Sequence, residues 1–181
     1  LGVAKSRNIA MKHSKGQYLA FIDSDDIWKK NKLSLQVEFM IKNSRNFSFT
    51  SYDVINEKDM VISKRKVFKD IEYKELYLSN IIGLSTVMAH KKLLPKLKFP
   101  NLNTQEDFAV WLKLSRNGEK LSHIQQTLSN WRKTKNSLSS NLFKKLKDAF
   151  KLYYIYEKKN FILSVFSVVI LSYKKIVKNF N

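Results

Sequence analysis

The sequence lacks cysteine and has little histidine. With no cysteine in 181 residues, disulfide bonds, thiolate metal sites and a cysteine nucleophile are all excluded. The three histidines, His13, His90 and His123, lie far apart and without metal-ligand spacing. The longest apolar stretch, 161–172, is too short to span a bilayer, which takes about 20 residues. It is typical of an interfacial or core helix.

Acidic residues are also scarce. Asp and Glu number 15 against 34 Lys and Arg, which gives a formal net charge of +19 and a pI near 10.0. This imbalance predicts an anionic partner, either nucleic acid, a phosphate-bearing substrate or an acidic membrane surface. The length fits about one domain. Hydrophobic residues make up 44% of the chain, which is enough for a packed core.

Hydrophobic periodicity predicts helices and strands in alternation, and therefore an α/β fold. Helix 3–15, Gly16 and strand 18–22 form an α-to-β unit that needs a parallel neighbouring strand, which no upstream segment supplies. Because the helical pattern starts at Leu1, we expect a fragment, or a chain without its N-terminal strands. Further helices are expected at 29–43, 70–79 and 104–118, and further strands at 47–55, 60–68, 81–89 and 121–131.

Two of these helices have a predicted buried face. Helix 29–43 has one apolar stripe. Helix 104–118 is expected to start at a Thr104 N-cap and to end with Gly118 as its C′ residue. The two stripes are Leu33, Val37, Met40 and Ile41, and Phe108, Trp111 and Leu112.

Residues 141–181 differ in composition from residues 1–140. This segment contains nine lysines against two acids, Asp148 and Glu157, and it is rich in aromatic residues. We therefore predict a domain at 1–140 followed by a basic amphipathic helical tail at 141–181. Such a tail is suited to the anionic face of a membrane.

The densest negative charge in the chain directly follows strand 18–22. Asp23, Asp25 and Asp26 surround Ser24. In open α/β sheets, ligands bind just past the carboxyl ends of strands, and two carboxylates two residues apart can face one hard cation. The alternative is a polar turn whose Asp and Ser side chains cap the next helix.

A second acidic pair, Glu106 and Asp107, opens helix 104–118. The pattern Thr104-x-x-Asp107 resembles a capping box, so a purely structural role is a strong alternative. The functional interpretation is that one acidic site holds a metal-bound diphosphate while the other supplies a general base.

Taken together, these segments resemble the inverting family 2 glycosyltransferases, which have the nucleotide-sugar GT-A fold. The resemblance covers about residues 2–140, and its pieces follow the family's order and spacing. They are GVAKSRNIA (2–10), GQYLAFIDSDDIW (16–28), STVM (85–88), QEDFAVWLKL (105–114), and WR (131–132) with SLS (137–139). The family opens with further strands that hold the nucleoside, and this chain begins after them. The resemblance therefore implies a GT-A mixed sheet flanked by helices and truncated at its N-terminus.

The resemblance implies a role for each acidic site. The family's DXD motif falls on Asp23-Ser24-Asp25. Asp25, assisted by Asp23, is expected to bind Mn²⁺ or Mg²⁺ on the donor diphosphate, and Asp26 is expected to hold the turn. Asp107 matches the catalytic base that deprotonates an acceptor hydroxyl.

Other positions are implied to contact donor or acceptor. Donor residues are expected at Arg7, Asp23, Ser24, Asp25 and Arg132, where Arg132 and the 137–139 loop form a closing segment. Acceptor residues are expected at Glu106, Trp28, Ser85 and Thr86. Each has a structural alternative. Arg7 fits an exposed charge on a helix surface equally well. Arg132 fits a polar, solvated loop, and Ser85 and Thr86 fit ordinary packing within a strand. Trp28 and Trp111 are candidates for stacking on a sugar ring, but Trp111 is better interpreted as a core residue.

The expected partners are a nucleotide-diphosphate sugar, with UDP-sugars favoured, a glycan or lipid-linked acceptor, and an anionic membrane surface. We expect a cytoplasmic protein peripheral to the inner membrane, acting in surface polysaccharide or lipooligosaccharide synthesis. The alternatives are an inactive remnant, a membrane-associated partner subunit and a nucleic-acid-binding module. The last is not expected, because no helix-turn-helix, RNP-like or zinc-finger pattern is present.

Overall fold

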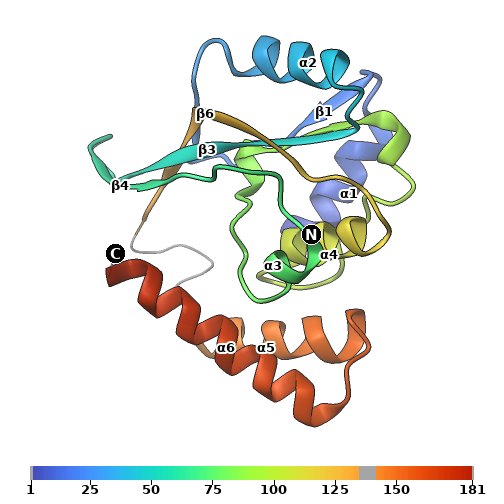
Figure 1. The fold of residues 1–181 in the computed structure, drawn as a ribbon, viewed down its shortest axis with the longest axis vertical. Coiled ribbons are helices and arrows are strands. Elements are labelled where there is room, and N and C mark those ends of the chain that lie inside the picture. Colours follow the sequence, from blue (N-terminus) through green and yellow to red (C-terminus); the bar gives the residue numbers. More distant parts are fainter. Residues whose placement is uncertain (1, 135–141, 181) are drawn as a thin grey trace.

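The computed structural model describes residues 2–134 and 142–180, and places side chains in these ranges up to residue 174. One mixed sheet lies between helices (Figure 1). Its strand order is β1-β5-β3-β6-β2, and β4 pairs with β3. The strands are β1 (Tyr18–Ala20), β2 (Ile27–Trp28), β3 (Phe47–Ile55), β4 (Val61–Arg65), β5 (Met88–His90) and β6 (Ser122–Arg132).

Helices cover both faces of this sheet. Figure 1 shows α2 on one face and α1, α3 and α4 on the other, with the α5–α6 hairpin beyond them. The α-helices are α1 (Val3–His13), α2 (Lys32–Lys42), α3 (Tyr73–Tyr77), α4 (Glu106–Arg116), α5 (Leu142–Lys151) and α6 (Phe161–Phe180). Short 3₁₀ turns η1 (Leu84–Thr86) and η2 (Lys91–Leu93) flank β5, and a π-helical turn, η4 (Leu152–Tyr156), follows α5.

The strand expected at 18–22 is shorter than predicted and pairs differently. β1 ends at Ala20 and lies antiparallel to β5, with Leu19 opposite Ala89, so the expectation of a parallel partner is not met within the described residues. The parallel pair of the sheet is β3 with β6. The segment expected as one strand at 81–89 forms η1 and then β5. The helix expected at 70–79 is limited to α3.

Helix α2 buries only part of the predicted stripe: Met40 is 1% exposed, as expected, but the other fully buried positions were not predicted. Lys32 and Gln36 are fully buried, whereas Leu33 and Ile41 are 45% and 64% exposed. The physical reason is that the opposing surface is polar. Gln36 Nε2 donates to Ser48 Oγ (3.1 Å) and to the Thr86 carbonyl (3.0 Å), and the Lys32 ammonium donates to Gln36 Oε1. These partners satisfy polar groups that would otherwise be costly to bury.

The main core lies between the sheet and α4. Phe108, Trp111 and Leu112 are fully buried, which confirms the predicted stripe of this helix. The Trp111 ring packs edge-on against Phe47 of β3 at 5.0 Å, so Trp111 is a core residue as the alternative interpretation held. Gly118 has a φ of +80°, as expected of a C′ residue. This core holds the start of α4 at the site described next.

Candidate functional site

The acidic turn 21–26 is held in place by η1. The Asp26 amide donates to the Asp23 carbonyl (3.0 Å), which closes the turn, and the Asp23 amide donates to Ser85 Oγ (3.0 Å). The Ser85 carbonyl accepts from Trp28 Nε1 (2.7 Å) and from Ser129 Oγ (3.0 Å). Ser85 therefore ties together the two ends of the turn and β6.

Two predicted acceptor residues are buried beneath this turn. Ser85 is 4% and Thr86 2% exposed, and the Thr86 hydroxyl donates to the Gly83 carbonyl (2.6 Å). Trp28 is half-buried, and the Lys32 ammonium lies 4.5 Å from its ring centroid. In the structure these three side chains support the acidic turn. Binding of an acceptor by them remains a prediction.

Helix α4 begins at Glu106, and the expectation of a Thr104 N-cap is wrong. The N-cap residue is Gln105, which adopts the left-handed conformation with φ of 63° and makes no capping hydrogen bond. Thr104 is held by the C-terminal part of the chain instead, because its amide (2.9 Å) and hydroxyl (3.2 Å) both donate to Asp148 Oδ2. A non-glycine residue in this conformation is strained, and such strain concentrates at functional sites.

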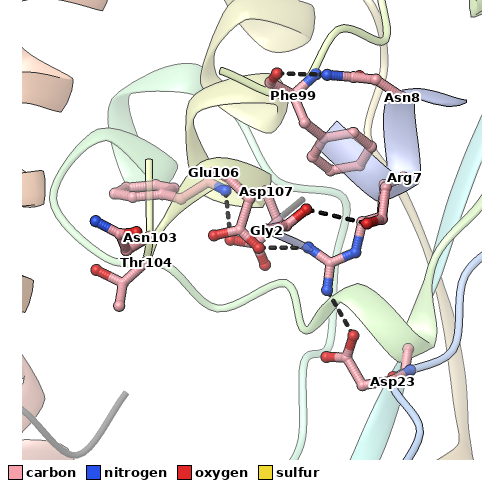
Figure 2. A network of polar contacts seen from close by, with 12 residues as sticks. Gly2, Arg7, Asn8, Asp23, Phe99, Asn103, Thr104, Glu106 and Asp107 are labelled. Atoms are coloured by element: carbon pink, nitrogen blue, oxygen red, sulfur yellow. Dashed lines mark hydrogen bonds and ion pairs between the residues drawn. The ribbon is translucent and has the colours of Figure 1, made fainter. Parts of the chain in front are cut away.

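Arg7 of α1 joins the two acidic sites. One guanidinium nitrogen donates to Asp23 Oδ1 (2.5 Å), and the other donates to Glu106 Oε1 (Figure 2). Its side chain is only 16% exposed and lies over the Phe99 ring at 5.6 Å. Arg7 is therefore no helix-surface charge. It links side chains that are 16 and 99 residues away in sequence.

Asp107 has a perturbed acidity. Burial, followed by the negative charge of Glu106, raises its pKa to about 7, and the nearby Arg7 guanidinium opposes the shift. Its Oδ1 accepts from the Phe108 amide (2.6 Å). A carboxylate with a pKa near 7 can accept a proton at neutral pH and return it afterwards, as a general base does.

Asp26 and Arg132 fix the far side of the turn. Asp26 is 8% exposed, and burial raises its pKa to about 6. Its Oδ1 accepts from the Arg132 amide (2.9 Å), in agreement with its predicted structural role. Arg132 ends β6, and its guanidinium donates to the carbonyls of Asp25 and Asn56 (both 2.9 Å). Arg132 therefore contacts the acidic turn itself, while 137–139 lies outside the described residues.

Ser24 and Asp25 are exposed at the tip of the turn. Within the described ranges, no group of three His, Asp or Glu side chains could enclose a metal ion. Mg²⁺ bound to a substrate diphosphate takes only one or two carboxylates from the protein, and the remaining ligands are phosphate oxygens and water. The exposed Asp25 carboxylate, with Asp23 beside it, fits that chemistry but not a cage made of protein ligands alone.

Sequence reasoning missed two residues of this site. Gln105 carries the backbone strain, and its buried Oε1 has no hydrogen-bond partner within the described part of the chain. Burial raises the pKa of Tyr52 of β3, and the charges of Asp107 and Asp26 add to this shift. The sequence gives no sign that a tyrosine within a strand lies near the acidic residues. Gln105 directly precedes Glu106 and could have been predicted as a site residue.

Comparisons with known proteins agree with this geometry. A model of "Glycosyl transferase family 2" matches residues 1–99. The chain is 34% identical over 169 residues to the putative teichuronic acid biosynthesis glycosyltransferase TuaG of Bacillus subtilis, covering 93% of this chain and 67% of the relative. It is 36% identical over 147 residues to the Escherichia coli UDP-Glc:alpha-D-GlcNAc-diphosphoundecaprenol beta-1,3-glucosyltransferase WfgD, covering 81% and 57%.

The fold is also that of a solved enzyme structure. Staphylococcus aureus TarS 1–349, in complex with UDP-GlcNAc, superposes with a TM-score of 0.68 at 18% identity. The match covers 90% of this chain and 50% of TarS 1–349, so the chain spans about half to two thirds of the proteins it resembles. The mixed sheet with flanking helices is the GT-A arrangement. Family model, relatives and fold agree, and the chain belongs to glycosyl transferase family 2.

Proposed function

We propose that this chain carries the catalytic centre of a glycosyltransferase. It transfers a sugar from a nucleotide diphosphate, with a UDP-sugar favoured, to a glycan or lipid-linked acceptor in bacterial surface polysaccharide or lipooligosaccharide synthesis. The observation that carries the proposal is Arg7, which brings the Asp23 turn and the Glu106–Asp107 pair into one cluster. The names of TuaG and WfgD support the polysaccharide context, and the TarS complex supports a UDP-sugar donor.

In this mechanism Asp107 acts as the general base. Its carboxylate takes the proton from an acceptor hydroxyl while that oxygen attacks the anomeric carbon of the donor sugar. The bond from this carbon to the diphosphate oxygen breaks, and its electron pair leaves with the nucleoside diphosphate. A single displacement of this kind inverts the anomeric configuration. The pKa of about 7 places the base close to neutral pH.

Arg7, Ser24 and the DXD carboxylates form the donor side. Mn²⁺ or Mg²⁺ held by Asp25, and by Asp23 beside it, would neutralise negative charge on the departing diphosphate as a Lewis acid. Arg7 is charged and can exchange a carboxylate partner for a phosphate oxygen. Arg132 keeps the backbone of Asp25 in place and orients the turn.

Glu106 forms the acceptor side together with residues of the turn. Its carboxylate adjoins Asp107 and can accept a hydrogen bond from an acceptor hydroxyl. Trp28, whose Nε1 donates to the Ser85 carbonyl, would stack on a sugar ring beside the turn, and Ser85 and Thr86 lie beneath it. These four residues would set the position of the attacking oxygen relative to Asp107.

The tail supports a peripheral location at the cytoplasmic face of the inner membrane. In α6 the serines face inward, with Ser164 fully buried and Ser167 5% exposed, while large apolar side chains face solvent. Within the described ranges, no helix is long and apolar enough to cross a bilayer. An exposed apolar face with nearby lysines is suited to an anionic lipid surface. The exposed apolar residues are Phe161, Ile162, Val165, Phe166, Val169 and Tyr173.

The test is release of nucleoside diphosphate from a panel of UDP-, dTDP- and GDP-sugars with Mn²⁺. The full chain is compared with Asp107→Asn, Asp25→Ala and, as a control, Glu38→Gln, which changes an exposed acid on α2. We expect metal-dependent release by the full chain and the control, and losses of about 100-fold or more in the two site variants.

Two outcomes would overturn the proposal. Release that persists in Asp107→Asn would remove the assigned base. Absence of release from every donor, also after a strand–turn–strand segment from a relative is fused upstream, would refute the transferase assignment. Activity that appears only in the fusion supports the assigned site and shows that the chain needs further donor-binding residues.

A further inference from the structure

The Arg132 guanidinium joins the acidic turn to the hairpin turn between β3 and β4. Its Nε donates to the Asp25 carbonyl (2.9 Å), its Nη1 donates to the Asn56 carbonyl (2.9 Å), and its Nη2 forms an ion pair with Asp59 Oδ1 (2.6 Å). All three guanidinium nitrogens are therefore engaged by the protein itself, and one of their three partners carries a negative charge.

The hairpin turn is closed by hydrogen bonds of its own. Asn56 Oδ1 accepts from the Lys58 amide (2.9 Å) and the Met60 amide (3.0 Å), and the Asn56 amide donates to the Met60 carbonyl (2.9 Å). The Asp59 carboxylate takes no part in these bonds, and its side chain is 67% exposed. Its backbone has a φ of 61°, a left-handed conformation that Asp and Asn adopt more readily than most residues. The Asp59 side chain can therefore leave Arg132 without opening the turn.

A phosphate would compete with Asp59 for this guanidinium. Arginine binds phosphate best through two parallel N–H···O bonds. Because every nitrogen of Arg132 already has a partner, such a phosphate has to share or replace one of them. The carbonyls of Asp25 and Asn56 belong to the backbone, whereas Asp59 offers an exposed side chain whose negative charge repels the phosphate. Asp59 is therefore the partner that a phosphate displaces.

The position of Arg132 suits a contact with the donor diphosphate. Its guanidinium lies against the backbone of Asp25, whose carboxylate is exposed at the tip of the turn and is expected to hold the metal on that diphosphate. The Arg132 amide donates to Asp26 Oδ1 (2.9 Å), so its backbone stays in place when the guanidinium changes partner. An exposed ion pair contributes only about 0.2–1 kcal/mol, so its exchange for a phosphate contact costs little.

We propose that Asp59 is a positioning residue of the donor site. Its carboxylate holds the Arg132 guanidinium beside the acidic turn, and a phosphate oxygen of the nucleoside diphosphate replaces it when the donor binds. The proposal rests on the proposed function, because that function supplies the diphosphate. It assigns Asp59 to the donor side, where a negative charge on the β3–β4 hairpin sets the affinity for nucleoside diphosphates.

The test measures binding to the full chain by calorimetry with Mg²⁺ present, so it does not depend on turnover. The probes are UDP, inorganic diphosphate and uridine, which lacks phosphate. Three variants are compared with the wild type. Asp59→Asn removes the carboxylate, Asp59→Glu keeps the charge, and Glu57→Gln removes the same charge from another exposed position in the same turn.

Asp59→Asn should bind UDP and inorganic diphosphate about two- to fivefold more tightly, because the phosphate no longer has to displace a carboxylate. The affinity for uridine should not change. Asp59→Glu and Glu57→Gln should bind UDP within about 1.5-fold of the wild type.

Several results would refute this role of Asp59. Unchanged or weaker binding of UDP by Asp59→Asn would make Asp59 a purely structural partner of Arg132. An equal gain in Glu57→Gln would indicate general charge repulsion, and a gain for uridine would indicate a contact with the nucleoside. Binding of neither UDP nor diphosphate by any of the four proteins would also refute the exchange. Failure of the transferase assay, with the predicted gain intact, would refute the proposed function and leave the assignment of Asp59 standing.

Discussion

At the scale of single residues, the site depends on how burial and neighbouring charges shift the pKa values of carboxyl groups. Asp107, which is half-buried, and Asp26, which is buried, both have raised pKa values, and their surroundings differ. Asp107 lies beside Glu106 and faces the proposed reaction centre. The Asp26 carboxylate accepts a hydrogen bond from the Arg132 amide and holds the turn in place. Under the proposed mechanism the raised pKa serves proton transfer at Asp107, whereas at Asp26 it accompanies a structural hydrogen bond.

Replacing Glu106 should change the pH dependence of activity. Glu106→Gln removes the adjacent negative charge that raises the pKa of Asp107, so this pKa should fall. Asp107 must be ionised to act as a base, and the acidic limb of the kcat/KM profile should therefore move to lower pH. The control is Glu119→Gln, an acid beyond the opposite end of α4 from Asp107. An acidic limb that stays at the wild-type pH would contradict the assignment of Asp107 as the base.

Asp26→Asn should stabilise the protein at neutral pH. The folded pKa of about 6 exceeds the ordinary value of 3.8, so ionisation of Asp26 disfavours the fold as pH rises through 6. The Asn oxygen can still accept the Arg132 amide. We expect a gain of about 1–3 kcal/mol in unfolding free energy at pH 7 that shrinks toward pH 4. Denaturant unfolding at both pH values measures it, with Asp25→Asn in the same turn as control. A gain independent of pH would refute this account.

At the scale of elements, α2 shows a buried lysine used as part of a helix–sheet contact. Lys32 is fully buried, lies over the Trp28 ring and donates to Gln36. Burial lowers its pKa to about 7. Because Trp28 also donates to the Ser85 carbonyl, this helix supports the acidic turn from the side opposite α1.

The stability difference between Lys32→Met and wild type should depend on pH. The pKa of Lys32 is about 7 in the folded protein and 10.5 in the unfolded chain. Above pH 10.5 the amine is neutral in both states. As pH falls toward 7, the unfolded chain takes up a proton that the buried Lys32 does not, so the wild-type protein loses stability. Lys32→Met should therefore gain unfolding free energy relative to wild type, by about 1 kcal/mol or more, between pH 10 and pH 7. Unfolding in urea at both pH values measures this. The exposed Lys30→Met is the control, and an equal pH dependence in both variants would contradict the burial of Lys32.

At the scale of the whole molecule, the C-terminal helices are joined to the part of the chain that carries the candidate site by buried contacts. Leu152 and Tyr153 are fully buried in the main core, and the Tyr153 hydroxyl donates to the Tyr77 carbonyl (2.6 Å). The Asp148 carboxylate accepts hydrogen bonds from the amides of Asn103 and Thr104, just before α4 begins. The tail therefore supports the helix that carries Asp107.

Asp148→Ala should lower both stability and activity. The variant removes the acceptor of three hydrogen bonds and leaves the Thr104 amide buried without a partner, a loss of about 2–3 kcal/mol. Because the loop before Gln105 loosens, kcat should fall while the pH of the acidic limb stays unchanged. Urea unfolding and the donor assay measure the two effects. Asp148→Asn, which keeps an oxygen acceptor, should lose less. Equal losses in both variants would mean that the hydrogen bonds are not the cause.

Much of the arrangement was predictable from local pattern. β3 spans the expected 47–55, β6 lies within one residue of the expected 121–131, and α4 buries its predicted stripe. These elements have long, regular hydrophobic periodicity, which reports directly on the face turned to the core. The strand partner of β1 and the buried face of α2 were not predictable, because they depend on the polar or apolar character of a distant surface.

The sequence by itself determined the family, the α/β class and the two acidic sites, because these follow from residue types at fixed spacing. Tertiary structure alone decided that Arg7 joins Asp23 to Glu106, that Asp148 holds the loop before α4, and that α6 turns many but not all of its apolar side chains outward. The physical reason is distance along the chain. Ion pairs and burial between residues tens of positions apart arise only when packing places them together, and packing also sets the pKa of Asp107.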